Sequence, residues 1–230
     1  MSTNDMNDDN IFAGSDAEIP DTLGLPETGI QKVPVMPLSE VVIFPYALSP
    51  LVVEGETSIK LVETAMNGSR LLGLFPELTE QHIAEAEASN LKIQTEKFDN
   101  KTLAETGVLG RIVKMLKFPD GTVRVLIRGL ARIKLVSQVP DAEPPCAIVE
   151  RVHEEKDETI ETLALARNAI KQFHEVISYS PAFPEELKIA VLNMNDNIRI
   201  VDLIADTINI SFLEKLSVLS LPKLQERLQL

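Results

Sequence analysis

The hydrophobic pattern of this chain changes period once, near Glu154. Before that residue, apolar positions alternate with polar ones or form short runs, as in strands; after it they recur every three or four residues, as in helices. The predicted fold class is α+β: a β-rich N-terminal subdomain, built as a twisted sheet or partly open barrel with one or two helices, then a bundle of four to five helices. The predicted divisions are a disordered acidic tail over 1–32, the β-rich subdomain over 33–153 and the helical bundle over 154–230.

Prolines cut the first apolar stretch, Val33–Val53, into short pieces. Proline fixes φ and lacks a backbone donor, so the pattern excludes a long helix and favours edge strands and turns. The elements predicted here are strands over Val33–Leu38, Val41–Phe44 and Leu48–Val53, a helix capped by Thr57 and closed by Gly68, and a strand over Leu71–Phe75 ended by Pro76. A short helix over His82–Ala88 and a strand over Leu91–Phe98 are predicted to follow.

The clearest local signal is the turn sequence Pro119-Asp120-Gly121. Proline fixes φ, aspartate bonds its own backbone and glycine adopts a positive φ, so a hairpin is predicted here. Beyond the turn, Val123–Leu135 alternates with period two, and its basic residues are predicted to point away from the core. Gly129 is predicted to form a bulge or bend, and Ala147–Val152 to add a further strand.

The helical half begins with one long apolar face, followed by several helix-capping signals. The predicted helix face contains Leu163, Ala166, Ile170, Phe173 and Ile177, and Ser180-Pro181 ends it. The following helices are predicted over Glu185–Leu192 after Pro184, after a cap at Asn195 or Asp196, after the capping box Ser211-x-x-Glu214, and after a cap at Ser220. The last of them carries no stop signal before Leu230, so we expect that it continues further in a longer protein.

The net charge of −13 argues against general affinity for nucleic-acid phosphates. Charge is unevenly distributed: Met1–Gln31 holds seven acids and no lysine or arginine, whereas Arg111–Lys134 holds seven bases and one acid. The acidic N-terminus is predicted to be a solubilising tail, with attachment of a partner as the alternative. The single cysteine, Cys146, and the lack of a long apolar run predict a cytoplasmic protein that does not enter a membrane.

The sequence contains no motif of a known catalytic or cofactor site. It has no phosphate-binding GxxxxGK[ST] loop, no HExxH helix, no CxxC pair and no GxSxG elbow. Its histidines, His82, His153 and His174, are far apart, and nothing near Cys146 would activate a thiol. We therefore predict no catalytic residue, no metal site and no cofactor in this chain.

Three stretches combine spaced prolines and glycines with a distinctive apolar pattern. They are VPVMPLSEVVIFPYALSPLVVEGETSIKLVETAM (Val33–Met66), GVLGRIVKMLKFPDGTVRVLIRGLARIKL (Gly107–Leu135) and LNMNDNIRIVDLIADTI (Leu192–Ile208). Together they resemble the N-terminal domain of the Lon family of ATP-dependent proteases, over about residues 33–230. The sequence departs from the family pattern at Ser39, where arginine is frequent, and in a longer, more acidic connection over 77–100.

The resemblance implies a substrate-recognition and assembly domain rather than an enzyme. Its implied partners are unfolded or damaged polypeptides, the rest of a Lon protease and neighbouring subunits. ATP and Mg²⁺ are expected only in an ATPase domain, and peptide cleavage only in a peptidase domain of the Ser-Lys type, both outside this chain. The alternative is a stand-alone Lon-domain adaptor, or a protein that binds a small ligand in a pocket between its two halves.

Two groups of residues are candidates for partner binding. Apolar residues of the proline-rich strands are predicted to line a polypeptide-binding groove, with burial in the core as the alternative; they are Phe44, Tyr46, Leu48 and Leu51. Bases of the hairpin are predicted to dock acidic segments, with an ordinary solvated strand face as the alternative; they are Arg111, Lys114, Arg124, Arg128 and Arg132.

Overall fold

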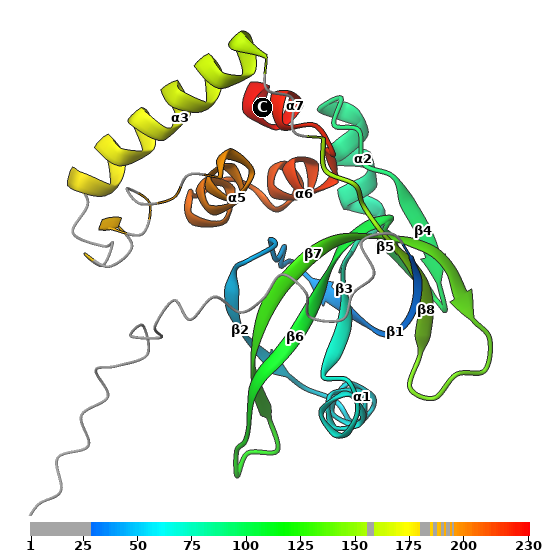
Figure 1. Cartoon of the computed structure of the whole chain (residues 1–230). Helices are drawn as coiled ribbons and strands as arrows, with labels where there is room; N and C mark the ends of the chain where they lie inside the picture. The colour runs from blue at the N-terminus through cyan, green and yellow to red at the C-terminus, as the bar shows by residue number, and fades with distance from the viewer. Residues whose placement is uncertain are drawn as a thin grey trace, which may run out of the picture.

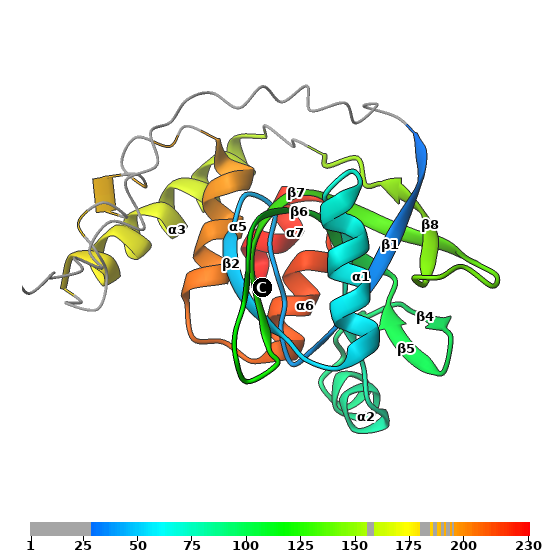
Figure 2. The same cartoon turned by 90° about the horizontal axis from the view of Figure 1, so that it is seen from below.

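The computed structural model describes residues 29–155, 159–179, 185, 188–189, 191, 194 and 196–230. A curled sheet forms its centre, with one helix on one side and a layer of helices on the other (Figures 1 and 2). The strands are β1 (Ile30–Ser39), β2 (Leu48–Val53), β3 (Leu71–Glu77), β4 (Thr95–Phe98), β5 (Lys101–Ala104), β6 (Thr106–Lys117), β7 (Val123–Val139) and β8 (Cys146–Arg151). The helices are α1 (Glu56–Asn67), α2 (Glu80–Ala88), α3 (Ile160–Tyr179), α5 (Asn197–Thr207), α6 (Phe212–Ser220) and α7 (Leu224–Gln229).

Five of the strands close into a ring in the order β1–β8–β7–β6–β3 and back to β1. The ring closes because β1 is long enough to pair twice: Val33 lies opposite Ala147 of β8, and Val35 lies opposite Gly73 of β3. A buried apolar cluster with members from all five strands fills the ring, including Phe75. The α+β prediction is confirmed, and the barrel is closed rather than partly open.

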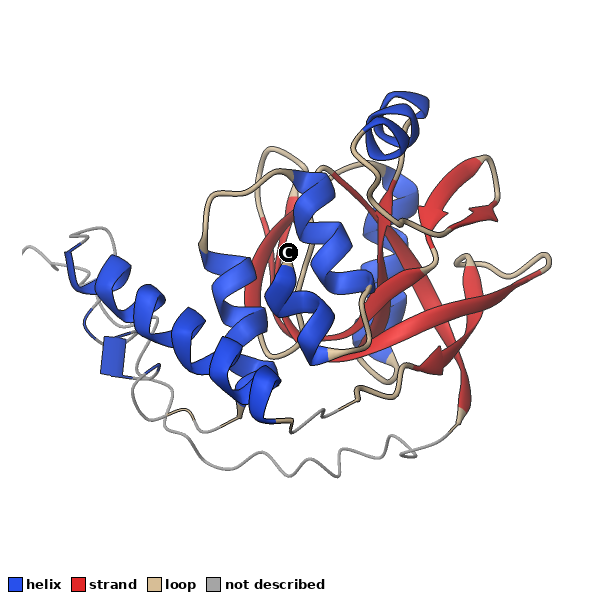
Figure 3. Cartoon of the chain, turned by 90° about the horizontal axis from the view of Figure 1, so that it is seen from above, coloured by secondary structure: helices blue, strands red, loops and turns tan. Residues whose placement is uncertain are grey.

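Two further apolar layers attach the helices to the outside of this barrel. Leu61, Val62 and Ala65 of α1 pack against one wall of the sheet. On the opposite side, Leu213 and Leu216 of α6 pack in a cluster that also contains residues of α2 and α5. Helices α3, α5, α6 and α7 lie together on that side, as seen from above in Figure 3.

The predicted hairpin joins β6 to β7. The backbone N–H of Thr122 donates to Asp120 Oδ1 at 2.9 Å, and Gly121 has φ 84°, as the turn sequence requires. Bulges interrupt the β6–β7 pairing beside Gly110 and between Ile112 and Lys114. Gly129 lies at the first of these bulges, where a Cβ atom would collide with the carbonyl oxygen of Phe44.

Several local predictions in the β half were wrong. Val41–Phe44 forms no strand, because Val42, Ile43 and Phe44 fill the core from an irregular segment. Helix α1 begins after Gly55 and has no cap from Thr57. Element boundaries also differ from those predicted: β3 continues through Pro76 to Glu77, β4 begins only at Thr95, and residues 30–32, predicted in the tail, belong to β1.

In the helical half, the capping signals identify two helix starts. Asp196 Oδ1 accepts from the N–H of Ile198 at 3.0 Å, and Ser211 and Glu214 form the predicted capping box. Ser220 does not cap the last helix; it ends α6, and its hydroxyl donates to the carbonyl of Leu216. The predicted helix over Glu185–Leu192, the stop at Ser180-Pro181 and residues 1–28 of the tail lie largely or wholly outside the described residues.

Candidate functional site

Strands β2, β7 and β6 form a three-stranded ribbon with one face turned away from the core. The pairing places Val52, Arg124 and Leu116 in one row across the ribbon, and Leu48, Arg128 and Arg111 in another. Between these rows, Pro50 pairs with Leu126 and Leu126 with Lys114. Because residues paired across a sheet share a face, these nine residues make up one surface, which we call the ribbon face.

Four of the five apolar members of the ribbon face are open to solvent, and the fifth, Leu126, is half-buried. The exposed fractions are 60% for Val52, 47% for Leu116 and 40% for Leu48, and Pro50 is exposed as well. Alternate residues of β7 point the other way: Val123, Val125 and Ile127 are buried against α1. A contiguous exposed apolar surface on a stable sheet is typical of a partner-binding site.

No acidic side chain among the described residues forms an ion pair with the four bases of the ribbon face, although the charges of Asp120 in the turn and Arg124 interact. None of Arg111, Lys114, Arg124 and Arg128 forms an ion pair with any described residue, and none of the nine residues is acidic. Arg124 instead stacks on the ring of Phe118, with its guanidinium carbon 4.3 Å from the ring centroid. The ribbon face therefore carries four positive charges that its own residues do not neutralise.

Two of these bases are direct neighbours across the ladder. Arg111 of β6 lies opposite Arg128 of β7, and like charges in that position repel each other. Arg111 is half-buried, and its Nε atom is buried without a hydrogen-bond partner. A carboxylate placed between the two guanidinium groups would relieve the repulsion and supply the missing acceptor.

Arg132, the fifth predicted docking base, does not belong to the ribbon face. Its side chain has no exposed area and points toward the helical layer, which corrects the prediction that it faces solvent. Its Nη2 and Nη1 atoms donate to the two carboxylate oxygens of Asp202 in α5, at 2.6 and 2.7 Å, and its Nε donates to the carbonyl of Leu219 at 3.0 Å. The bulge at Gly129 interrupts the alternation of β7, so Arg132 lies on the face opposite to that of Arg128. Helices α5 and α6 cover that face.

Arg132 is one of four charges in a balanced buried network. Arg227 of α7 donates to Glu154 at 2.9 Å and lies 3.5 Å from Asp202, while Glu154 also pairs with Arg132. Burial by itself would lower the pKa of Arg132, but the hydrogen bonds and charges of Asp202 and Glu154 outweigh it and raise the pKa. The network fixes the helical half to β7.

The four predicted groove residues have different environments. Phe44 is fully buried in the cluster that it shares with residues of α5 and α6. It is therefore a core residue, as the alternative prediction stated, and not a groove residue. Leu51 is partly buried against the α1 layer, while Leu48 lies on the ribbon face. Tyr46 is 40% exposed, has φ 66°, and its ring lies 4.1 Å from the guanidinium carbon of Arg199. Tyr46 and Leu48 are thus the surface residues of the group.

A cavity of about 150 Å³ lies where the two halves of the molecule meet. Phe44–Ala47 line it from the β half, and Leu203 and Asp206 line it from α5. Burial raises the pKa of the Asp206 carboxyl. The volume is below the range of about 300–1,000 Å³ that is typical of small-molecule sites, and corresponds to a single side chain.

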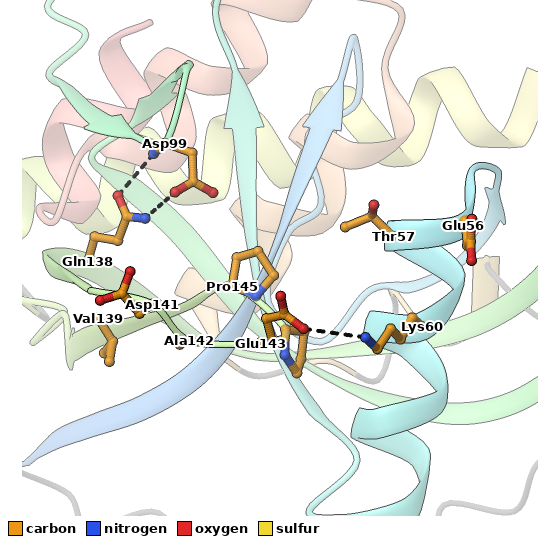
Figure 4. A pocket seen from close by; sticks show the side chains of 11 residues that line it. Glu56, Thr57, Lys60, Asp99, Gln138, Val139, Asp141, Ala142, Glu143 and Pro145 are labelled. Carbon is orange, nitrogen blue, oxygen red and sulfur yellow. Dashed lines mark hydrogen bonds and ion pairs between the residues drawn. The ribbon is translucent and has the colours of Figure 1, made fainter.

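A wider hollow of about 570 Å³ lies between α1 and the loop over 139–145. Figure 4 shows its polar side chains pairing across and along its walls: Lys60 with Glu143 at 3.5 Å, and Gln138 with Asp99. Glu56 and Asp141 add further negative charge. The lining of this hollow is mainly polar and its net charge is negative, opposite in sign to that of the ribbon face.

Sequence reasoning missed four members of the ribbon face: Pro50, Val52, Leu116 and Leu126. Val52 and Leu126 lie in correctly predicted strands, and strict alternation from Leu51 and Val125 would have assigned them to the outer face. Leu116 could not have been assigned in this way, because the bulge between Ile112 and Lys114 changes which residues of β6 face outward.

In the described part of the chain, no helix combines the length and apolar character that a bilayer crossing requires.

Comparison with solved structures places this fold among Lon N-terminal domains. The N-terminal domain of the Mycobacterium avium complex Lon protease matches with a TM-score of 0.68 and 17% identity, covering 86% of this chain and 95% of that one. The Lon N-terminal domain protein from Xanthomonas campestris matches with a TM-score of 0.57 and 18% identity, with the same coverage. At these identities the likeness concerns the fold alone.

Sequence comparison shows the family. Residues 32–230 match the model of the ATP-dependent protease La (LON) substrate-binding domain. The Lon protease of Dictyoglomus thermophilum is 33% identical over 212 residues, which are 92% of this chain and 24% of that protein. The Lon protease of Escherichia coli K12 is 32% identical over 198 residues, which are 86% of this chain and 24% of that protein. The chain belongs to the Lon substrate-binding domain family, and it spans about a quarter of the length of these relatives.

Proposed function

We propose that this chain binds unfolded segments of protein substrates for a Lon-type ATP-dependent protease, and that the ribbon face is the binding surface. The observation that carries the proposal is the presence of exposed apolar side chains and four uncompensated bases on the same face of one ribbon. An unfolded polypeptide offers apolar side chains that a folded protein buries, and these would pack beside Val52 and Leu116.

The edge of the ribbon supports the same proposal. Strand β2 pairs with β7 on one side and has no strand partner on its other side among the described residues. An extended segment can add to such an edge through its backbone while its side chains lie on the ribbon face. Pro50 removes one backbone donor from β2, so a bound segment would pair with it over a short length.

In this proposal, ATP hydrolysis and peptide cleavage belong to other domains of a Lon-type protease, and the chain also contributes contacts to neighbouring subunits. The family match and the relatives named Lon protease support this division. A cytoplasmic location is part of the same proposal and is supported by the single cysteine, Cys146, whose thiol is free. The small cavity beside Tyr46 supports a second candidate function, the binding of a ligand no larger than one side chain.

Substitution of the apolar side chains tests the proposed function. We expect the double variant Val52→Ser with Leu116→Ser to bind fluorescently labelled casein at least about tenfold more weakly, since two side chains would each lose part of about 1.5–3 kcal/mol of burial. Both side chains are exposed, so the fold should be unaffected. Anisotropy titration measures the affinity, and circular dichroism checks the fold.

The matched control is the double variant Val136→Ser with Val176→Ser, which removes similarly exposed valines from outside the ribbon face. We expect casein affinity to remain within about twofold of the original chain, a difference of roughly 0.4 kcal/mol. Equal losses in both double variants, or no loss in the folded ribbon-face variant, would rule out this surface as the binding site.

A further inference from the structure

The ribbon face has a complementary segment within its own chain. Residues 5–27 contain seven acids and no base, whereas the ribbon face has four bases and no acid. Apolar residues lie between those acids, as they lie between the bases of the ribbon face; they are Ile11, Phe12, Ile19, Leu23 and Leu25. Opposite charge combined with interspersed apolar positions on both sides is the complementarity expected of binding partners.

The segment is long enough to reach the ribbon face. The described structure begins at residue 29, just before β1, so 28 residues precede it. They can span at most about 100 Å, and a domain of 200 residues is only about 40 Å across. Because the segment is covalently attached, its effective concentration at the ribbon face is on the order of 1 mM, enough for a weak contact to compete with polypeptides in solution.

We infer that residues 5–27 dock on the ribbon face of their own chain and compete there with polypeptide substrates. This regulatory inference rests on the proposed function for its consequence, but docking itself does not. Carboxylates of the segment would pair with Arg124 and Arg128, and one would occupy the position between Arg128 and Arg111, where a buried Nε lacks an acceptor. Only polypeptides that bind better than the segment would displace it.

A synthetic peptide of residues 5–27 with a fluorescent label tests the docking directly. It is titrated into the full chain whose own segment has been neutralised by seven substitutions: Asp5→Asn, Asp8→Asn, Asp9→Asn, Asp16→Asn, Glu18→Gln, Asp21→Asn and Glu27→Gln. We expect saturable binding that weakens as salt is added. The unmodified chain should bind the peptide at least about tenfold more weakly, since its own segment already occupies the ribbon face.

Charge reversal locates the binding surface. In the neutralised chain, Arg124→Glu with Arg128→Glu should weaken peptide binding at least about tenfold, because attraction becomes repulsion. The control, Arg151→Glu with Arg167→Glu, changes the net charge equally at exposed residues of β8 and α3 and should leave binding unchanged. No binding to the neutralised chain, equal loss in both reversals, or equal binding by the neutralised and unmodified chains would overturn the inference.

Two further results separate this inference from its alternatives. Dimerisation of the unmodified chain that the neutralising substitutions abolish would mean that the segment docks on a second copy, which overturns docking within one chain. Casein binding by the neutralised chain without peptide binding would contradict the inference and leave the proposed function standing. Peptide binding without casein binding would support the docking and contradict the proposed function.

Discussion

Two carboxylates at the residue scale show that environment decides whether a charge stabilises the fold. Asp206 lines the cavity between the two halves, where burial raises the pKa of its carboxyl group. Glu214 is fully exposed, and the hydrogen bonds that it exchanges with Ser211 in the capping box lower its pKa. Ionised Asp206 therefore opposes folding, whereas ionised Glu214 favours it.

These opposite shifts predict opposite effects of removing each charge. Because the folded-state pKa of Asp206 is raised, its contribution to stability is present below the ordinary pKa of about 3.9 and lost as pH rises. Asp206→Asn should therefore raise the urea midpoint at about pH 7 and change it little at about pH 4. A fall in the midpoint for Asp206→Asn at neutral pH would show that its charge is compensated.

Because the pKa of Glu214 is lowered, its contribution is present at neutral pH and lost as pH falls, so Glu214→Gln should lower the midpoint at about pH 7.

At the scale of elements, β7 connects the two halves of the molecule. Its first part presents Arg124 and Arg128 on the ribbon face, and four residues beyond Arg128 the side chain of Arg132 is buried beneath α5 and α6. The buried network holds one acid and one base from the helices, Asp202 and Arg227, against Arg132 and Glu154. Removing one of its charges leaves the others buried without compensation.

We expect Arg132→Met to lower the free energy of unfolding by about 3–5 kcal/mol, the usual effect of breaking a buried ion pair from one side. Methionine fills part of the space but leaves Asp202 without its two closest donors. Urea denaturation at neutral pH measures the loss. Arg128→Met on the same strand is the matched control and should change stability by less than about 0.5 kcal/mol, since it removes an exposed side chain. Similar effects in both variants would mean that the network contributes little.

The same strand shows which features the sequence could predict. The hairpin turn and the capping box of α6 were predicted because each depends on residues adjacent in sequence, such as Asp120 with Gly121. The period of β7 was also predicted, and by strict alternation Arg128 and Arg132 would share a face. The bulge at Gly129 places them on opposite faces, since Arg128 lies opposite Arg111 and Arg132 lies opposite Val108, three residues away on β6. Helix α5 then covers Arg132 through a contact that joins residues 70 positions apart. Closure of the barrel by β1 is non-local in the same way.

At the scale of the whole molecule, the stable core and the proposed binding surface are separate. The closed barrel, α1 and the helical layer bury the apolar side chains needed for stability. The ribbon of β2, β7 and β6 uses one face for that core and leaves the other open, with its bases unneutralised. A surface of this kind can bind extended segments of varied sequence without rearrangement of the fold.

The most direct test of this account is to observe which side chains of the chain contact an unfolded polypeptide. Methyl NMR spectra of the labelled 230-residue chain, recorded while unlabelled casein is added, report each leucine and valine separately. If the ribbon face binds the polypeptide, the methyl signals of Leu48, Val52, Leu116 and Leu126 shift together, while those of Val136 and Val176 stay in place. Shifts that centre on α3 or on the hollow beside α1, with the ribbon-face methyls unchanged, would contradict binding at this surface.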